Sequence, residues 1–357
     1  MIHWHDCLFG LMVLMAMPTT NAQDLASDKV SLWQGQERRD FQVDGRDCLL
    51  IVPKGAAPGK PWIWRTEFFG HEPQADLALV ERGWHVAYMD VQDLYGGPEA
   101  MKHMDKFYAH LTARRGLSRK PVLEGFSRGG LFTLNWAARN PRKVACIYND
   151  APVCDFKSWP GGKGKGKGSP DDWQRCLKVY GLTENEAISY KLNPVDNLKP
   201  LAKAKIALLH VCGDADDVVP IEENTRLVER RYKALGGVME VIAKPGVGHH
   251  PHSLQDPAPI VDFILRHTRT SSGKASGRTR VFRTQACFLC PYGSATASEK
   301  TFPRASRPTR NISQILDRND ETRGRAARQG AGSVSWGVTP VSAGPSRGDC
   351  SACPRVT

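Results

Sequence analysis

The chain has 357 residues, of which 41% are hydrophobic and 24% charged, and a formal net charge of +12. This composition allows a large buried core. The charge would suit a nucleic-acid-binding protein, but residues 271–357 hold 14 Lys and Arg against 5 Asp and Glu. The rest of the chain is nearly balanced, which excludes a strongly basic folded domain. We expect no nucleic-acid partner, and a basic tail that binds anionic surfaces is the weaker alternative.

Residues 1–22 have the pattern of a secretory signal peptide. An apolar run, Cys7–Met17, is followed by Pro18 and by the small-residue sequence Thr20-Asn21-Ala22. The run is too short to span a bilayer, although no Lys or Arg precedes it. We expect a secreted or periplasmic protein with no stable membrane span after signal removal; the alternative is an ordinary buried N-terminal segment. Residues 23–46 follow as an N-terminal segment.

Short apolar runs alternate with amphipathic stretches between residues 47 and 268, which is typical of an α/β fold with a mostly parallel central sheet sandwiched by helices. Strands are expected at Cys48–Val52, Trp62–Trp64, His85–Met89, Val122–Leu123, Val144–Tyr148, Ile206–Val211 and Val238–Ile242. Helices are expected at Gln74–Arg82, Glu99–Arg114, after Ser127, after Pro220 and at Ile260–Arg266.

The alternation is interrupted at about residues 151–204, which we interpret as a small lid insert. Residues 161–169, GGKGKGKGS, are too rich in glycine for a helix or a strand. They indicate a solvated mobile loop rather than a specific anion-binding loop. Trp159 and Trp173 lie on either side of this loop, and we predict that both contact the substrate.

The cysteines of the central region fall into two groups. Cys154 and Cys176 flank the glycine-rich loop, and in an oxidising compartment a disulfide between them would stabilise the fold by about 3 kcal/mol. Cys48, Cys146 and Cys212 lie on predicted strands and are interpreted as small buried residues.

Residues 269–357 are rich in Arg, Ser, Gly, Thr and Pro and show no helical or strand periodicity. Such a segment buries too little apolar surface to fold, so we expect a disordered basic tail. Its two C-x-x-C pairs, Cys287/Cys290 and Cys350/Cys353, lie too far apart for a zinc ribbon. An alternative is that the tail is a non-native extension of the reading frame.

The sequence Gly125-Phe126-Ser127-Arg128-Gly129 lies between a predicted strand and a predicted helix. A G-x-S-x-G at such a junction forces a sharp turn, and glycine two positions to either side of the serine avoids a clash. The turn places Ser127 Oγ at the helix N-terminus, where free N–H groups favour an oxyanion. Ser127 is therefore predicted to be a nucleophile rather than a structural turn residue.

A serine nucleophile needs a histidine base and a carboxylate that orients the base. The stretch LLHVCGDADDVVP, at the end of the next-to-last predicted strand, offers Asp214, Asp216 and Asp217. The stretch KPGVGHHPHSL, after the last predicted strand, offers His249, His250 and His252.

In the order serine, acid, histidine, residues 47–268 resemble the α/β-hydrolase family, and in particular its secreted bacterial prolyl-oligopeptidase-like and dienelactone-hydrolase-like esterases. The resemblance implies that Ser127 is the nucleophile. It implies Asp216 as the acid, because the family's acid commonly precedes a V-P by three residues. It implies His249, in the turn G-V-G-H, as the base. The two neighbouring acids would then cap the loop.

The oxyanion hole is where the chain departs from the family pattern. The loop after the strand Trp62–Trp64 reads RTEFFGH and lacks the H-G pair that many members use. We expect the N–H of Arg128 to be one donor and the N–H of Phe68, or of its neighbour Glu67, to be the other. Glu67 is also predicted to bind substrate, and Arg65 or Arg128 would neutralise its charge.

These features predict a secreted serine hydrolase that cleaves a carboxylic ester through an acyl-enzyme, without a cofactor. The aromatic residues of the insert would suit sugar rings, so the predicted substrate is a small-molecule or carbohydrate ester such as an acetylated polysaccharide. The alternatives are a peptidase of the same fold and a non-catalytic binding protein on a hydrolase scaffold. The sequence does not predict an oligomeric state.

The neighbouring histidines of the same loop, His250 and His252, raise the question of a metal site. A proline separates them, and no Cys or acidic residue lies close to them in sequence. The sequence therefore predicts no metal site. His250 and His252 are interpreted as contacts around the triad or the lid, or as solvated loop residues.

Overall fold

The computed structural model describes residues 28–268. These residues all belong to the first of two compact units, which spans residues 1–280. The predicted signal peptide and the predicted disordered tail with its C-x-x-C pairs lie outside the described residues. Within the described part of the chain, no helix combines the length and the apolar character that crossing a membrane requires.

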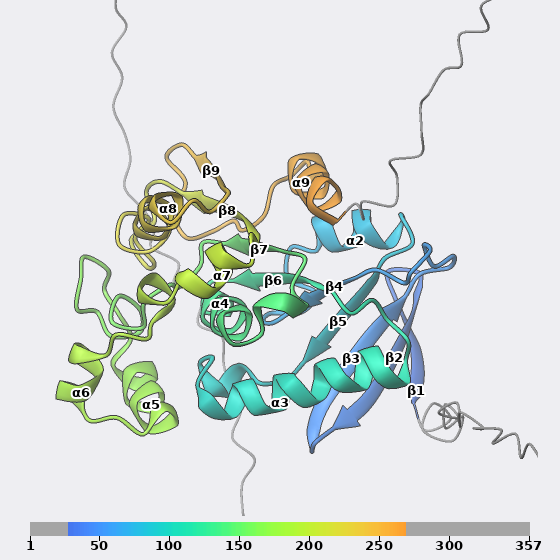
Figure 1. Ribbon diagram of the computed structural model, residues 1–357, viewed down its shortest axis with the longest axis horizontal. Coiled ribbons are helices and arrows are strands. Elements are labelled where there is room, and N and C mark those ends of the chain that lie inside the picture. The colour runs from blue at the N-terminus through green and yellow to red at the C-terminus, as the bar shows by residue number, and fades with distance from the viewer. Residues whose placement is uncertain (1–27, 269–357) are drawn as a thin grey trace, which may run out of the picture. The chain divides into compact units, whose positions relative to one another are not determined.

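A nine-stranded sheet runs through the described residues in the order β1-β2-β3-β5-β4-β6-β7-β8-β9 (Figure 1). The strands are β1 (Lys29–Trp33), β2 (Gln36–Val43), β3 (Arg46–Val52), β4 (Trp62–Arg65), β5 (His85–Met89), β6 (Val122–Phe126), β7 (Cys146–Asp150), β8 (Ala207–Gly213) and β9 (Met239–Lys244). Strands β1, β2, β3 and β5 pair antiparallel, and the pairs from β5 through β9 are parallel. The predicted mostly parallel sheet is confirmed.

Helices cover both faces of the sheet. The α-helices of the described residues are α2 (Gln74–Val80), α3 (Pro98–Ala109), α4 (Gly129–Arg139), α5 (Pro170–Tyr180), α6 (Glu184–Ser189), α7 (Lys199–Lys203), α8 (Thr225–Ala234) and α9 (Ala258–Thr268). A π-helical turn, His110–Arg114, continues α3 to the predicted end of that helix. Figure 1 shows α2 and α9 on one side of the sheet and α3 and α4 on the other. The predicted sandwich is therefore confirmed.

The core consists of two hydrophobic layers, one on each face of the sheet. Strand β4 illustrates their origin, because alternate side chains of a strand point to opposite faces. Trp64 packs edge-on against Trp136 of α4 and Phe107 of α3, with ring centroids 5.0 and 5.3 Å apart. Ile63 belongs to the opposite layer, with Phe263 of α9. Burial on both faces explains why the parallel strands are continuous apolar runs.

The two N-terminal strands were not predicted. The sequence gives no strand within residues 23–46, the N-terminal segment, but β1 and β2 form antiparallel strands at the edge of the sheet. The two-residue turn Gln34-Gly35 connects β1 to β2, and Asp44-Gly45 connects β2 to β3; all four residues have positive φ. Such turns match the right-handed twist of strands, and Asp-Gly is a strong hairpin signal. That signal could have identified the hairpin, although the charged strand β2 lacks a clear apolar alternation.

The insert folds as a small helical layer with its own aromatic core. Phe156 packs against Tyr180 and Tyr190, with ring centroids 4.9 and 5.1 Å apart. Residues 161–169 form neither helix nor strand, as predicted. Cys154 and Cys176 are both buried and free, so the disulfide considered from the sequence is not formed. The predicted burial of the three strand cysteines is confirmed.

Candidate active site

The turn after β6 holds Ser127 in a left-handed conformation, with a φ of 51°. A β-carbon on Gly125 would lie 2.6 Å from the carbonyl oxygen of Gly129, and one on Gly130 would lie 2.6 Å from Pro152 Cβ. Glycine is therefore needed for close approach. The N–H of Ser127 donates to the carbonyl oxygen of Asp150 at 2.8 Å, which ties the turn to β7. A strained, tightly supported turn of this kind is typical of a functional residue.

Three side chains from separate strand ends meet at this turn. Ser127 follows β6, Asp216 follows β8 and His249 follows β9. Ser127 Oγ lies 2.9 Å from His249 Nε2, and His249 Nδ1 lies 2.7 Å from Asp216 Oδ2. The second oxygen of Asp216 accepts the N–H groups of Val218 and Val219 at 2.9 and 2.8 Å. The carboxylate is thus fixed on both oxygens and can hold the imidazole in the orientation that a base needs.

The structure separates the three candidate acids. Asp214 accepts a hydrogen bond from the N–H of Gly246 at 2.7 Å and so ties the acid loop to the histidine loop. Asp217 is exposed and pairs with Lys167 of the glycine-rich loop at 2.6 Å. Only Asp216 contacts a histidine among these three. The other two acids stabilise loops, as the sequence analysis expected.

Two backbone N–H groups are available near the nucleophile turn. Arg128 lies directly before α4, and Phe68 has a φ of 50° in the loop after β4. Neither N–H donates to another group within residues 28–268. The loop of Phe68 is held against β6, because the N–H and the hydroxyl of Thr66 both donate to the carbonyl oxygen of Glu124. Unpaired donors at fixed positions are what an oxyanion hole requires.

Glu67 belongs to this loop and is fully buried, so it is not accessible to a substrate, contrary to the prediction that it binds one. Neither of its carboxyl oxygens accepts a hydrogen bond from the described residues. Arg128 Nε lies 3.4 Å from Glu67 Oε1, and it would pair with Glu67 when that carboxyl group is ionised. Arg65 instead pairs with Asp76 at 2.7 Å. Burial raises the pKa of Glu67 to about 8, against the opposing effect of Arg128. Glu67 is therefore largely protonated at neutral pH and brings little negative charge to the site.

The two tryptophans of the insert differ in their positions. Trp159 is half-buried and stacks on Tyr95 with ring centroids 6.4 Å apart, and the Arg128 guanidinium lies 5.8 Å from the Tyr95 ring. Trp173 is buried, and its Nε1 donates to Glu184 at 2.6 Å. Trp173 thus packs the interior of the insert rather than an accessible surface. The sequence could not distinguish the two, because both residues flank the same loop.

The geometry can be compared with known proteins. Residues 100–270 match the family model of the prolyl oligopeptidase family. The search of curated proteins gave no match. The solved structures include a puromycin-hydrolyzing peptidase of Mycobacterium tuberculosis, at 13% identity over 64% of this chain and 38% of that one, with a TM-score of 0.51. A puromycin hydrolase has 16% identity over 66% of this chain and 38% of that one, with a TM-score of 0.50.

This chain has an α/β-hydrolase fold, and residues 100–270, just under half of it, are similar to the prolyl oligopeptidase family. It spans 38% of the length of each of the two solved proteins above. An acetyl xylan esterase from a Thermoanaerobacterium species is also similar, at 17% identity over 69% of this chain and 91% of that one, with a TM-score of 0.48. At such identities, the likeness to the two structures with TM-scores of 0.51 and 0.50 establishes the fold alone. The arrangement of Ser127, His249 and Asp216 is the one that serine hydrolases use.

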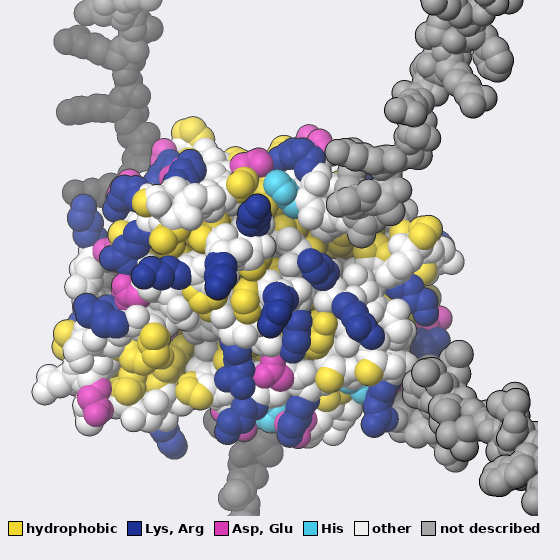
Figure 2. Space-filling model, viewed as in Figure 1, with side chains coloured by type: hydrophobic (Ala, Val, Ile, Leu, Met, Phe, Trp, Pro, Cys, Tyr) yellow, Lys and Arg dark blue, Asp and Glu magenta, His cyan; other side chains and the backbone are white. Residues whose placement is uncertain are grey.

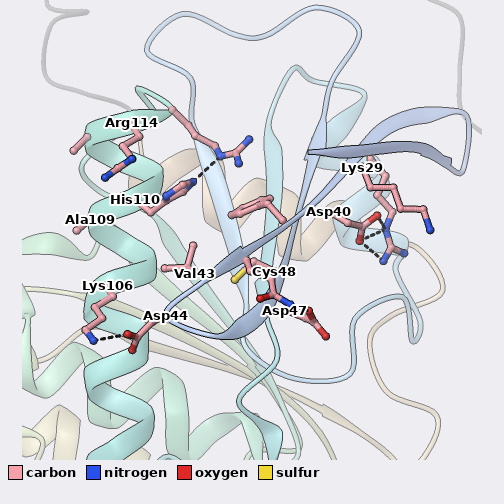
Figure 3. A pocket seen from close by; sticks show the side chains of 15 residues that line it. Lys29, Asp40, Val43, Asp44, Asp47, Cys48, Lys106, Ala109, His110 and Arg114 are labelled. Atoms are coloured by element: carbon pink, nitrogen blue, oxygen red, sulfur yellow. Dashed lines mark hydrogen bonds and ion pairs between the residues drawn. The ribbon is translucent and has the colours of Figure 1, made fainter. Parts of the chain in front are cut away.

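A large cavity of the hydrolase domain lies away from these residues. It has a volume of about 1040 Å³ and lies between the N-terminal strands and α3 (Figure 3). Its lining includes Lys29, Arg38, Phe41 and Lys106, but neither Ser127, His249 nor Asp216. The size of a cavity therefore does not locate the candidate active site in this domain, whereas the converging strand ends do.

The position of the acid can be tested by exchanging neighbouring carboxylates. Asp216→Asn should lower kcat for p-nitrophenyl acetate by about 10⁴-fold, because an amide cannot hold the imidazole in the required tautomer. Asp217→Asn is the matched control and should stay near wild type, because Asp217 is exposed and contacts Lys167. A large loss in the Asp217 variant with an active Asp216 variant would contradict the assignment.

The buried Glu67 predicts a pH dependence of stability. Its pKa of about 8 lies above the ordinary value of 4.5. Between these two values the unfolded chain loses a proton that the folded chain keeps, so the wild type should lose stability as the pH rises from about 5 to 8. Glu67→Gln removes this loss. The free energy of unfolding of the variant relative to wild type, measured in urea, should rise between pH 5 and pH 9. An unchanged difference would show that Glu67 is ionised throughout.

Proposed function

We propose that the protein is a carboxylic ester hydrolase that forms an acyl-enzyme on Ser127. The observation that carries the proposal is the relay of hydrogen bonds from Asp216 through His249 to Ser127, at 2.7 and 2.9 Å. His249 and Asp216 are nearly inaccessible, with side chains 8% and 1% exposed, so solvent competes little for these bonds. The nucleophile itself is half-buried and can be reached by a substrate.

The reaction would proceed in two balanced steps. Ser127 Oγ attacks the ester carbonyl while His249 Nε2 takes the hydroxyl proton, and the N–H groups of Arg128 and Phe68 bind the developing oxyanion. Collapse of this intermediate breaks the C–O bond to the alcohol, which leaves with the proton from His249. Water then attacks the acyl-serine, again losing a proton to His249. The carboxylic acid departs, and the proton returns to Ser127 Oγ.

The surroundings of Ser127 support an acetylated carbohydrate as the substrate. The half-buried ring of Trp159 stacks on Tyr95, whose ring lies 5.8 Å from the guanidinium of Arg128, the residue after Ser127. Such aromatic faces bind the apolar faces of sugar rings. The N-terminal signal pattern supports export, which would bring the enzyme to extracellular polysaccharides. In the view of Figure 2, Lys and Arg side chains are spread among hydrophobic and acidic ones.

A peptidase is the second candidate, and the family match favours it. The same relay cleaves amides when His249 protonates the leaving amine. The two candidates differ in the leaving group that the site accepts, so paired substrates can separate them.

The ester proposal is tested with matched acyl substrates. We expect the wild type to hydrolyse p-nitrophenyl acetate and to release acetate from acetylated xylan, and to cleave alanine p-nitroanilide far more slowly. Ser127→Ala should abolish both hydrolysis and labelling by a fluorophosphonate, whereas Ser118→Ala should do neither. Faster cleavage of the anilide would favour the peptidase. Hydrolysis that persists in Ser127→Ala would contradict the mechanism, and a protein that neither labels nor turns over any substrate would be a binding protein.

The sugar-binding surface makes a separate prediction. Trp159→Ala should raise KM for acetylated xylan by up to about tenfold, because contacts with the face of an aromatic ring contribute about 0.5–1.5 kcal/mol. Turnover of p-nitrophenyl acetate should change little, since that substrate has no sugar. Trp159→Phe is the control and should keep most of the affinity. Equal effects on both substrates would indicate that Trp159 supports the fold rather than the polysaccharide.

A further inference from the structure

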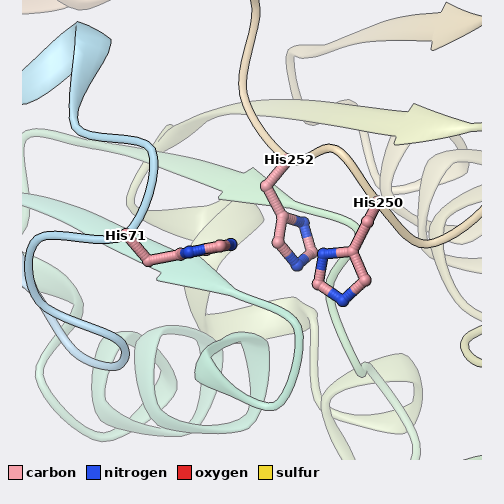
Figure 4. Close-up of side chains that lie close together, drawn as sticks. All are labelled: His71, His250 and His252. Atoms are coloured by element: carbon pink, nitrogen blue, oxygen red, sulfur yellow. The ribbon is translucent and has the colours of Figure 1, made fainter. Parts of the chain in front are cut away.

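Three histidines from two distant segments converge beside the candidate triad. His71 belongs to the loop between β4 and α2, and His250 and His252 belong to the loop after β9. One ring nitrogen from each lies within 4.8 Å of the other two. Figure 4 shows the three rings directed toward one another. The sequence predicts no metal site around His250 and His252, because their third partner, His71, comes from a distant segment that only the fold brings near.

One ring nitrogen of His252 donates to a buried carboxylate, as is typical of histidines that bind zinc. Its Nδ1 donates to Asp150 Oδ1 at 2.9 Å, and both side chains are buried. The other carboxyl oxygen of Asp150 accepts the N–H of Ser253 at 2.9 Å and the hydroxyl of Tyr148 at 3.1 Å. The carboxylate is thus fixed by three donors. A carboxylate on one ring nitrogen leaves the other nitrogen, Nε2, with its lone pair free for a metal.

The backbones of both loops are also anchored. The buried guanidinium of Arg65 donates to the carbonyl oxygen of His71, and the N–H of His71 donates to the carbonyl oxygen of Phe68 at 3.0 Å. On the other loop, Lys244 donates to the carbonyl oxygens of Pro251 and Ser253. The histidine side chains therefore project from fixed supports.

The side chains of His71 and His250 can adjust to an ion. Both are exposed, whereas His252 is 4% exposed. Nitrogens around tetrahedral zinc lie about 3.3 Å apart, since each Zn–N bond is about 2.0–2.1 Å. The separation of up to 4.8 Å must therefore close by about 1.5 Å, which rotation of the two exposed side chains can provide.

His249 is not available as a ligand. Its ring centroid lies 5.0 and 4.9 Å from those of His250 and His252, but its two nitrogens already face Asp216 and Ser127. A metal site made of the other three histidines leaves the relay intact. Their neutral imidazoles suit zinc rather than magnesium or calcium, which prefer oxygen ligands.

We propose that His71, His250 and His252 bind one Zn²⁺ ion, with water in the fourth, solvent-facing position. The ion joins the loop that carries Phe68 to the loop that carries His249, and so fixes two parts of the candidate active site relative to each other. Binding itself requires no catalysis, so this inference and the hydrolase proposal can fail independently.

Zinc binding is measured on the full chain after treatment with a chelator and dialysis. Isothermal titration with Zn²⁺ should show one more equivalent in the wild type than in His71→Ala, and the same loss is expected for His250→Ala. His267→Ala, which removes a histidine of α9 outside the cluster, should bind as the wild type does. Zn²⁺ should raise the Tm of the wild type and of His267→Ala more than that of His71→Ala, and Mg²⁺ should raise none of them.

X-ray absorption identifies the ligands. The zinc ion whose binding depends on His71 should have nitrogen and oxygen ligands at Zn–N and Zn–O distances of about 2.0–2.1 Å. Cysteine ligands elsewhere in the chain would give Zn–S distances of about 2.3 Å. Equal stoichiometry in wild type and His71→Ala would overturn the proposal, as would a shell of sulfur alone. Chelated wild type and chelated His71→Ala should have the same Tm, which separates loss of the metal from damage to the fold. A lower Tm of the chelated variant, with unchanged zinc stoichiometry, would assign His71 a purely structural role.

Discussion

The hydrogen bond between Asp216 and His249 depends on a close contact of two loops. A β-carbon on Gly213, the last residue of β8, would lie 2.0 Å from the carbonyl oxygen of Val247. The N–H of Ala215 donates to that same oxygen at 3.0 Å, and Asp214 accepts the N–H of Gly246. The backbones of the acid loop and the base loop are therefore in direct contact. Parallel strands β8 and β9 end at the same edge of the sheet, which makes this contact possible.

Asp150, at the end of β7, connects the rest of the site to this arrangement. Its backbone carbonyl accepts a hydrogen bond from the N–H of Ser127, and its carboxylate accepts one from Nδ1 of His252. One buried residue thus fixes the nucleophile turn and the histidine cluster together. The sequence did not single out Asp150, because it is the last residue of a buried strand and carries no motif. Its importance arises from the partners that the neighbouring strand and the β9–α9 loop bring to it.

The loop after β4 combines a strained backbone with a buried carboxyl group. Phe68 adopts a positive φ, which residues other than glycine rarely do. Glu67 is buried, and its carboxyl group accepts no hydrogen bond from the described residues. Both features cost stability and persist only where the surroundings impose them. Here the hydroxyl of Thr66 donates to the backbone of β6, and the guanidinium of Arg65 donates to the backbone carbonyl of His71. A loop held in this way can present the Phe68 N–H without reorganisation.

The sequence by itself determined that the chain forms a mostly parallel sheet, how its strands and helices alternate along the chain, and the turn at Ser127. Continuous apolar runs mark strands buried on both faces, and G-x-S-x-G marks a turn that larger residues would block. The antiparallel strands β1 and β2 were missed, since the charged residues of β2 conceal its alternation. The family resemblance pointed to Asp216 as the acid, and the tertiary structure showed that it is the one that meets His249. Only the tertiary structure decided that Glu67 is buried and that His71 joins His250 and His252. These depend on distances between residues far apart in the chain, which neither periodicity nor local motifs encode.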